Sequence, residues 1–162
     1  MRIAFVIKGE AASKANSREI VTRKYRDASG KVRSRPMSIK SDKARDYERA
    51  ALLQIPARAR VEIEGPVRVT MRIFYASERP DLDESVILDA MQSRYRTVKR
   101  NGVESRECLR KGVFVNDRQV REKHIYHGID RANPRAEIEV EPLHAQQIAL
   151  SLEADYNPLE SV

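Results

Sequence analysis

Residues 66–76 alternate between apolar and mostly polar side chains, and this pattern constrains the fold more than any other feature of the chain. A side-chain period of two is that of a β-strand with one face in the core and the other exposed. Residues 135–140 repeat the pattern, with apolar residues alternating with glutamates. The residues expected to face inward are Val67, Val69, Met71, Ile73 and Tyr75 on the first strand and Ala136, Ile138 and Val140 on the second. The chain is therefore expected to build a sheet with one covered face.

Two segments have the spacing of helices that cover such a face. Ser41 is a suitable N-cap and Asp42 suits the first turn, apolar residues then recur at helical spacing, and Pro56 ends the segment. Residues 84–98 carry a second apolar stripe and are predicted to form one helix. Residues 99–111 are interpreted as a basic loop or a short helix.

The remaining elements are short strands joined by turns. Strands are expected at residues 2–7, 20–26, 31–39, 113–115 and 120–129, and a terminal helix at 143–154. The second and third of these strands form a hairpin around a turn that contains glycine. Together the elements predict an α+β fold, a single domain in which two or three helices pack on a mixed β-sheet. The functional domain is expected to span residues 1–141, and residues 142–162 form an acidic helix or tail.

Positive charge is concentrated in two blocks of the chain. The sequence of 162 residues holds 31 Lys and Arg against 24 Asp and Glu, a formal net charge of +7. Residues 1–60 contain 16 basic and 6 acidic residues, and residues 92–124 contain 10 and 4. From residue 137 onward there are six acids and no Lys or Arg. A polyanion such as DNA or RNA is the natural partner of the basic blocks, and an ordinary solvated surface is the alternative.

Several classes of protein are excluded by other features. No run of about 20 apolar residues exists, which argues against a membrane-spanning helix. The first residues lack the long apolar region of a secretion signal, so we expect the protein to stay in the cytoplasm. Cys108 is the single cysteine, which excludes an internal disulfide and a Cys-rich zinc site.

The segment Arg79-Pro80-Asp81-Leu82-Asp83 is the most informative for chemistry. It follows the strand predicted at 66–76, and residues two apart in an extended chain face the same way, so its two carboxylates are expected to converge. A hard divalent ion stabilises such a pair, and Mg²⁺ is commonly bound by one or a few carboxylates and by waters. The alternative role for Asp83 is to cap the helix predicted at 84–98.

A third acid follows the short strand predicted at 113–115. If that strand lies beside strand 66–76, Asp117 can reach Asp81 and Asp83. Three carboxylates within a basic surface suit the hydrolysis of a phosphodiester. The basic residues would bind the phosphates, and the acids would hold a metal ion that activates water.

In their order and spacing these motifs resemble those of the RusA family of Holliday-junction resolvases, which are phage and prophage endonucleases. The matching segments are residues 80–83, 89–91 and 112–120, and looser similarity extends over residues 3–141. The resemblance implies a RusA-like fold and a homodimer that resolves four-way DNA junctions by paired symmetric nicks in recombination and repair. It also implies that the catalytic residues, which hold Mg²⁺ or alternatively Mn²⁺, are Asp81, Asp83 and Asp117. No small-molecule cofactor is implied, and the protein is expected in the cytoplasm of a bacterial host, encoded by the host or by a phage.

The chain departs from the family's pattern after its second aspartate. The family has Asn and shortly afterwards a Lys, whereas Glu84-Ser85-Val86-Ile87 stand here and no Lys occurs before Lys99. Three alternatives follow: the charge is supplied by Lys14, Lys99, Lys111 or Lys123, the site works without a lysine, or the activity is weakened. Residues 92–111 also form a long insertion relative to the family, interpreted as an element that contacts DNA or a second subunit.

Basic residues near these motifs are expected to position the DNA backbone. They are Lys14, Arg79, Lys99, Arg100, Lys111 and Lys123. Arg79 either stabilises the charged transition state or pairs with Asp81. His124 and His127 face opposite ways in the strand predicted at 120–129 and are not expected to share a metal ion. The rival hypothesis is a non-catalytic basic module that binds DNA or RNA and whose acids are structural.

Overall fold

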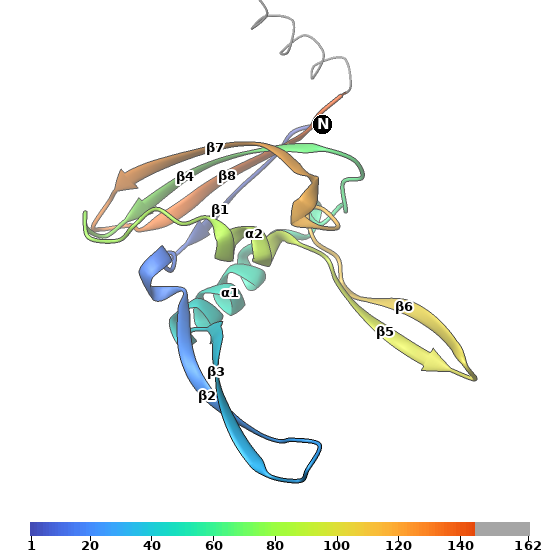
Figure 1. The fold of residues 1–162 in the computed structure, drawn as a ribbon. Coiled ribbons are helices and arrows are strands. Elements are labelled where there is room, and N and C mark those ends of the chain that lie inside the picture. The colour runs from blue at the N-terminus through green and yellow to red at the C-terminus, as the bar shows by residue number, and fades with distance from the viewer. Residues whose placement is uncertain (145–162) are drawn as a thin grey trace, which may run out of the picture.

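The central sheet has four strands in the order β1-β8-β4-β7 (Figure 1). The computed structural model describes residues 1–144. The strands are β1 (Ile3–Lys8), β4 (Val67–Tyr75), β7 (Val120–Ile129) and β8 (Arg135–Pro142). β4 pairs in parallel with β7 and antiparallel with β8, and β1 pairs antiparallel with β8. The predicted mixed sheet is therefore confirmed.

Inward side chains of the sheet form the core that the alternation predicts. All five inward residues of β4 have exposed fractions of 0–1%. Ala136, Ile138 and Val140 of β8 are buried beside them. The outward residues of both strands are half-buried or exposed, so the two strands have the expected faces.

Two α-helices cover one face of this sheet and leave the other face open (Figure 1). α1 (Asp42–Gln54) begins after Ser41, whose hydroxyl accepts a hydrogen bond from the Ala44 amide at 3.1 Å, which confirms the predicted N-cap. It ends two residues before Pro56, as expected for a residue that cannot continue a helix. α2 (Ser85–Met91) packs against α1 and buries five of its seven residues. Single turns of 3-10 helix are η1 (Lys14–Asn16), η2 (Ala57–Ala59) and η3 (Asp117–Gln119).

A β-hairpin precedes α1 and projects from the body of the molecule (Figure 1). Its strands are β2 (Arg18–Arg26) and β3 (Val32–Lys40), which confirms the hairpin predicted from the sequence. Asp27 organises the turn, because one of its carboxylate oxygens accepts hydrogen bonds from the Ser29 and Lys31 amides at 3.0 Å each. The same carboxylate pairs with Arg33, and these contacts lower the pKa of Asp27, chiefly through the Ser29 hydroxyl.

A second hairpin shows that the prediction of one helix over residues 84–98 is wrong. α2 ends at Met91, and the chain continues into the strands β5 (Arg94–Arg100) and β6 (Val103–Arg110). Residues 99–111 are therefore neither a loop nor a short helix. The turn explains the outcome, because Asn101 and Gly102 have φ values of +52° and +78°. Two consecutive positive φ values give the type I′ turn whose twist matches that of the flanking strands.

The short strand predicted at 113–115 is also wrong. Phe114 makes only isolated parallel bridges to Ile63 and Gln92, although it is fully buried. A short apolar run marks burial without specifying a strand. The strand predicted at 120–129 is confirmed as β7, and it occupies the place beside β4 that residues 113–115 were expected to take.

The terminal segment 142–162 lies almost wholly outside the described residues, and so does the helix predicted at 143–154. Its residues Leu143 and His144 are described and are not helical. Within residues 1–144 no helix has the length and apolar character needed to cross a membrane. The described chain is an α+β domain with two α-helices, a mixed four-stranded sheet and two hairpins.

Candidate functional site

The two hairpins carry the positive charge of the chain. Residues 18–40 contain eight basic and two acidic residues, and residues 94–110 contain six and two. All other residues of the chain together hold 17 basic and 20 acidic side chains, so their net charge is negative. Most hairpin residues are exposed. The hairpins are therefore the surfaces on which a polyanion would be attracted most strongly.

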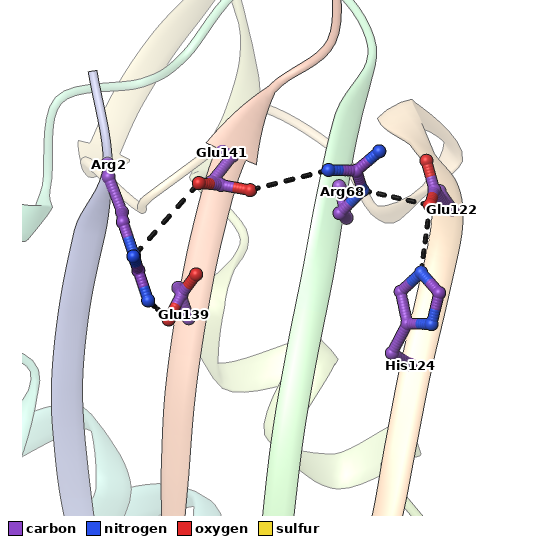
Figure 2. A network of polar contacts seen from close by, with 6 residues as sticks. All are labelled: Arg2, Arg68, Glu122, His124, Glu139 and Glu141. Atoms are coloured by element: carbon purple, nitrogen blue, oxygen red, sulfur yellow. Dashed lines mark hydrogen bonds and ion pairs between the residues drawn. The ribbon is translucent and has the colours of Figure 1, made fainter. Parts of the chain in front are cut away.

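The open face of the sheet has a different electrostatic character. Figure 2 shows a row of charged side chains that contact one another across the four strands, namely Arg2, Glu139, Glu141, Arg68, Glu122 and His124. The guanidinium of Arg68 lies 2.9 Å from Glu122 and 3.6 Å from Glu141, and it is the main cause of the lowered pKa of Glu122. The row holds three carboxylates and two guanidiniums, and each guanidinium is paired, so the row itself offers little attraction to phosphates.

The loop at residues 76–84, which carries Asp81 and Asp83, is anchored by the last residue of β4. Tyr75 is fully buried, and its hydroxyl donates a hydrogen bond to the Asp81 carbonyl and accepts one from the Asp83 amide, both at 3.2 Å. Burial raises the pKa of Tyr75, so the hydroxyl keeps the proton that it donates. One core side chain thus fixes the backbone at both acids.

Asp83 also has a structural role at the start of α2. Its carboxylate oxygen Oδ1 accepts a hydrogen bond from the Ser85 amide at 2.9 Å, which satisfies one of the free amides in the first turn of the helix. The contact resembles the alternative role predicted for Asp83, but the N-cap residue of α2 is Glu84, whose side chain makes no capping hydrogen bond, and Asp83 supports the first turn from one residue earlier. Within residues 1–144 the second oxygen, Oδ2, makes no hydrogen bond or ion pair, so it is available to a ligand.

Asp83 lines an open hollow of about 480 Å³ together with residues from the N-terminal loop. The hollow is bounded by Lys14, Ser17, Arg18, Leu82, Asp83, Glu84 and Ser85. The N-terminal loop is held against this region by Glu10, whose carboxylate accepts a hydrogen bond from the Ala76 amide at 3.0 Å. Of the four lysines proposed to replace the family's helix Lys, Lys14 is the one that shares this hollow with Asp83.

β7 borders the same loop from the neighbouring strand. The ammonium group of Lys123 lies 2.6 Å from the carboxylate of Glu84. The imidazole of His127 stacks on the ring of Tyr75 with centroids 5.3 Å apart. His124 instead contacts Glu122 on the open face, so the two histidines face opposite ways as predicted. β7 therefore supports the acidic loop, and the charge of Lys123 is already matched by Glu84.

Asp117 lies at the other end of the β4–β7 pair. It begins η3, immediately before β7, and the first residues of the two strands, Val67 and Val120, are paired in parallel. The loop at 76–84 begins after the last residue of β4, at the opposite end of the pair, and returns along the sheet to Lys123, which contacts Glu84 at the end of the loop. Asn116 and Gln119 fix the turn around Asp117 through a capping box. The expected approach of Asp117 to the acidic loop depended on a neighbouring strand at 113–115, and that strand is absent from the described sheet.

Asp81 and Asp83 each leave carboxylate oxygen open to a ligand. Asp81 is exposed, and Oδ2 of Asp83 has no protein partner within residues 1–144. Mg²⁺ is commonly held by one or two carboxylates with retained waters, so either acid could contribute to such a site. Within the described part of the chain, no three or more His, Cys, Asp or Glu side chains form a group that could hold a metal ion.

The other residues expected to contact DNA are exposed and do not share one site. Arg79 lies in the acidic loop and forms no ion pair with Asp81 within the described chain. Lys99 and Arg100 lie near the tip of the second hairpin, and Lys111 follows that hairpin. Arg100 and Lys111 have carboxylate partners at 3.1 and 3.6 Å.

Sequence reasoning missed two parts of this site. One is Tyr75, whose place as the last inward residue of its strand, six residues before Asp81, was the available signal. The other is the second hairpin as a separate basic arm, for which the Asn101-Gly102 pair was the signal. Comparisons with models of protein families and with curated proteins found no match to this chain. The resemblance to the RusA family therefore rests on the motifs themselves.

Proposed function

We propose that this protein binds DNA through its two hairpins and cleaves it as a metal-dependent endonuclease that resolves four-way junctions. The observation that carries the binding part is that the whole positive excess of the chain lies on residues 18–40 and 94–110. Both hairpins extend from the helix-covered side of the sheet, where α2 begins beside the acidic loop (Figure 1). A DNA backbone drawn to the hairpins would therefore pass close to that loop.

The catalytic part of the proposal rests on the loop that carries Asp81 and Asp83. These carboxylates would hold Mg²⁺, or Mn²⁺ in its place, and the bound ion would supply a water of lowered pKa and stabilise charge on the phosphate. Lys14 and Arg18, from the other side of the hollow, would bind the phosphate oxygens. Tyr75 would keep the two acids in place through its hydrogen bonds to their backbone.

Further parts of the proposal come from the resemblance to the RusA family. They are a RusA-like domain over residues 1–141, the homodimer, the paired symmetric nicks, and a metal-binding role for Asp117. A four-way junction has two-fold symmetry, so a dimer with one site per subunit matches it. For Asp117 to act with Asp81 and Asp83, bound DNA or the second subunit would have to bring it to the acidic loop.

The second candidate function is a basic module that binds DNA or RNA without cleaving it. Specific observations favour it: Asp83 accepts a hydrogen bond from the Ser85 amide at the start of α2, and within the described residues Asp117 forms no group of three metal ligands with Asp81 and Asp83. In this alternative the acids are structural and the hairpins alone carry the function.

Cleavage of a labelled four-way junction by two test variants and one control variant separates the two candidate functions. Asp81→Asn and Asp83→Asn are expected to lower the cleavage rate by more than about 100-fold and to keep junction binding in EDTA. The asparagine oxygen can still accept the Ser85 amide, so Asp83→Asn should unfold at the same temperature as the wild type. Glu78→Gln, which changes an exposed acid of the same loop, serves as the control and should cleave normally.

Asp117→Asn tests the assignment that rests on the resemblance alone. Loss of cleavage with retained binding would support the three-aspartate site, and wild-type cleavage would restrict the site to Asp81 and Asp83. Binding without cleavage by the wild-type protein, in Mg²⁺ and in Mn²⁺, would favour the non-catalytic module.

A further inference from the structure

Two arginines face each other across the base of the second hairpin. Arg94 of β5 and Arg110 of β6 are cross-strand partners in the antiparallel register. Like charges directly opposite each other in an antiparallel pair destabilise it. Within residues 1–144 neither guanidinium has a carboxylate within 4.0 Å, whereas Arg96 and Arg100 of the same hairpin both pair with Glu107. The base of the hairpin therefore keeps an unmatched pair of positive charges.

Burial makes this arrangement more unfavourable. Arg110 is half-buried, and its Nε atom is buried without a hydrogen-bond partner. Burial lowers the pKa of Arg110, the neighbouring charges of Arg94 and Arg60 lower it further, and the nearby carboxylate of Glu48 opposes this without reversing it. Arg60 itself donates to the backbone carbonyls of Leu52 and Ile55 and has no acceptor to offer Arg110. An anion at this place would satisfy the free donor and neutralise the repulsion.

The structure contains a polar pocket at this position. It has a volume of about 250 Å³ and lies at the bases of both hairpins, between Lys40 of β3 and Arg94 and Arg110 of the second hairpin. Glu48 and Asp89 also line it, but the ammonium of Lys40 lies 2.7 and 2.8 Å from their carboxylates. Lys40 pairs with both acids, so the charged side chains that line the pocket have a net charge of +1, from three cations and two anions. The two arginines are the cations of the pocket that form no ion pair within residues 1–144.

We propose that Arg94 and Arg110 bind a phosphate group of the DNA backbone in this pocket. The proposal rests on the proposed function. It adds a second contact to the DNA strand whose other phosphate lies at the acidic loop. Asp83 stands at the start of α2 and the pocket at its end, about 10 Å away for a helix of seven residues. The rise of about 3.4 Å per nucleotide is measured along the DNA axis, and the phosphates of one strand lie further apart because they also wind around that axis. The bound phosphate would therefore lie one or two nucleotides from the phosphate at the acidic loop.

The double variant Arg94→Gln/Arg110→Gln tests the proposal by DNA binding in EDTA, so that no cleavage is needed. The affinity for a four-way junction is expected to fall about tenfold or more, and the slope of log K against log salt concentration should fall in magnitude by about one. Arg49→Gln/Arg58→Gln removes the same charge from residues outside both hairpins and should change the affinity less. Since the substitutions remove a repulsion, the double variant should melt no lower than the wild type.

Junctions with one neutral methylphosphonate at each position locate the contact. One substitution, one or two nucleotides from the cleaved bond, should weaken wild-type binding and have no effect on the double variant. The inference would be overturned if methylphosphonates at all positions weakened wild-type binding equally. It would also be overturned if Arg94→Gln/Arg110→Gln and Arg49→Gln/Arg58→Gln bound the junction with equal affinity. Either result would leave the proposed function intact.

Melting of the wild type in phosphate and in chloride at equal ionic strength shows whether free phosphate binds. Stabilisation by phosphate without a loss of DNA affinity in the variant would also overturn the inference. Failure of the wild type to bind DNA at low salt would instead remove the proposed function itself.

Discussion

Replacing Tyr75 by Phe removes the one hydroxyl that holds the backbone at both Asp81 and Asp83. The two hydrogen bonds of 3.2 Å would be lost, while the ring, its burial and its stacking on His127 would remain. A buried donor or acceptor left without a partner costs about 1–3 kcal/mol. Asp81 is exposed, so water can satisfy its carbonyl, and the cost comes mainly from the half-buried Asp83 amide. We expect a loss of about 1–2 kcal/mol in the free energy of unfolding.

For a domain of this size such a loss lowers Tm by about 3–6 °C. Urea denaturation and thermal melting measure it directly, with Tyr126→Phe as the control because Tyr126 is exposed. Under the proposed function, Tyr75→Phe should also lower the rate of junction cleavage more than the affinity for the junction. The reasoning would be refuted if Tyr75→Phe were as stable as Tyr126→Phe, or if it lost stability and still cleaved at the wild-type rate.

Three further predictions concern packing, pH and salt. Gly112→Ala should destabilise the fold by about 1–3 kcal/mol, because the added Cβ would clash with the backbone of Met91 and Gln92, and an unchanged urea midpoint would contradict this. Hydrogen bonds, chiefly from the Tyr95 hydroxyl, hold the pKa of Glu62 below its ordinary value of 4.5, so its contribution to stability is present above pH 4.5 and lost as the pH falls through the lowered pKa. Melting curves from pH 6 to pH 3 should therefore converge for the wild type and Glu62→Gln, and parallel curves would refute the assignment. Lys99→Gln should reduce the salt slope of DNA binding by about one, as fluorescence anisotropy at several salt concentrations would show, and an unchanged slope would exclude a phosphate contact there.

The sheet could be predicted because the alternation of apolar and polar residues along its strands shows which side chains are buried. β4 and β8 each have one buried and one solvent-facing side, so the alternation of their residues gave both the strand and its inward face. The same type of evidence failed at residues 84–98, where Tyr95 and Val98 continue an apolar helical stripe and also suit a strand. The Asn101-Gly102 turn decided between the two structures, and weighing it would have predicted the hairpin.

The candidate site was predictable in part for a related reason. The position of Asp81 and Asp83 after β4 follows from their order in the chain, and the hydrogen bond of Asp83 to the first turn follows from the start of α2. The place of Asp117 depended on which strand lies beside β4, and no local pattern specifies that neighbour. The hollow shared by Lys14 and Asp83 likewise arises from a tertiary contact of the N-terminal loop.

Cleavage of a four-way junction by the wild-type protein would show whether it is a junction-resolving endonuclease. The protein would be incubated with an end-labelled junction and with a linear duplex of matched sequence, each in Mg²⁺ and in EDTA. We expect paired, symmetric nicks in the junction only, and only in Mg²⁺. Tight binding of the junction with no cleavage in Mg²⁺ or Mn²⁺ would contradict this expectation, and the two basic hairpins would then serve a protein that binds DNA without cutting it.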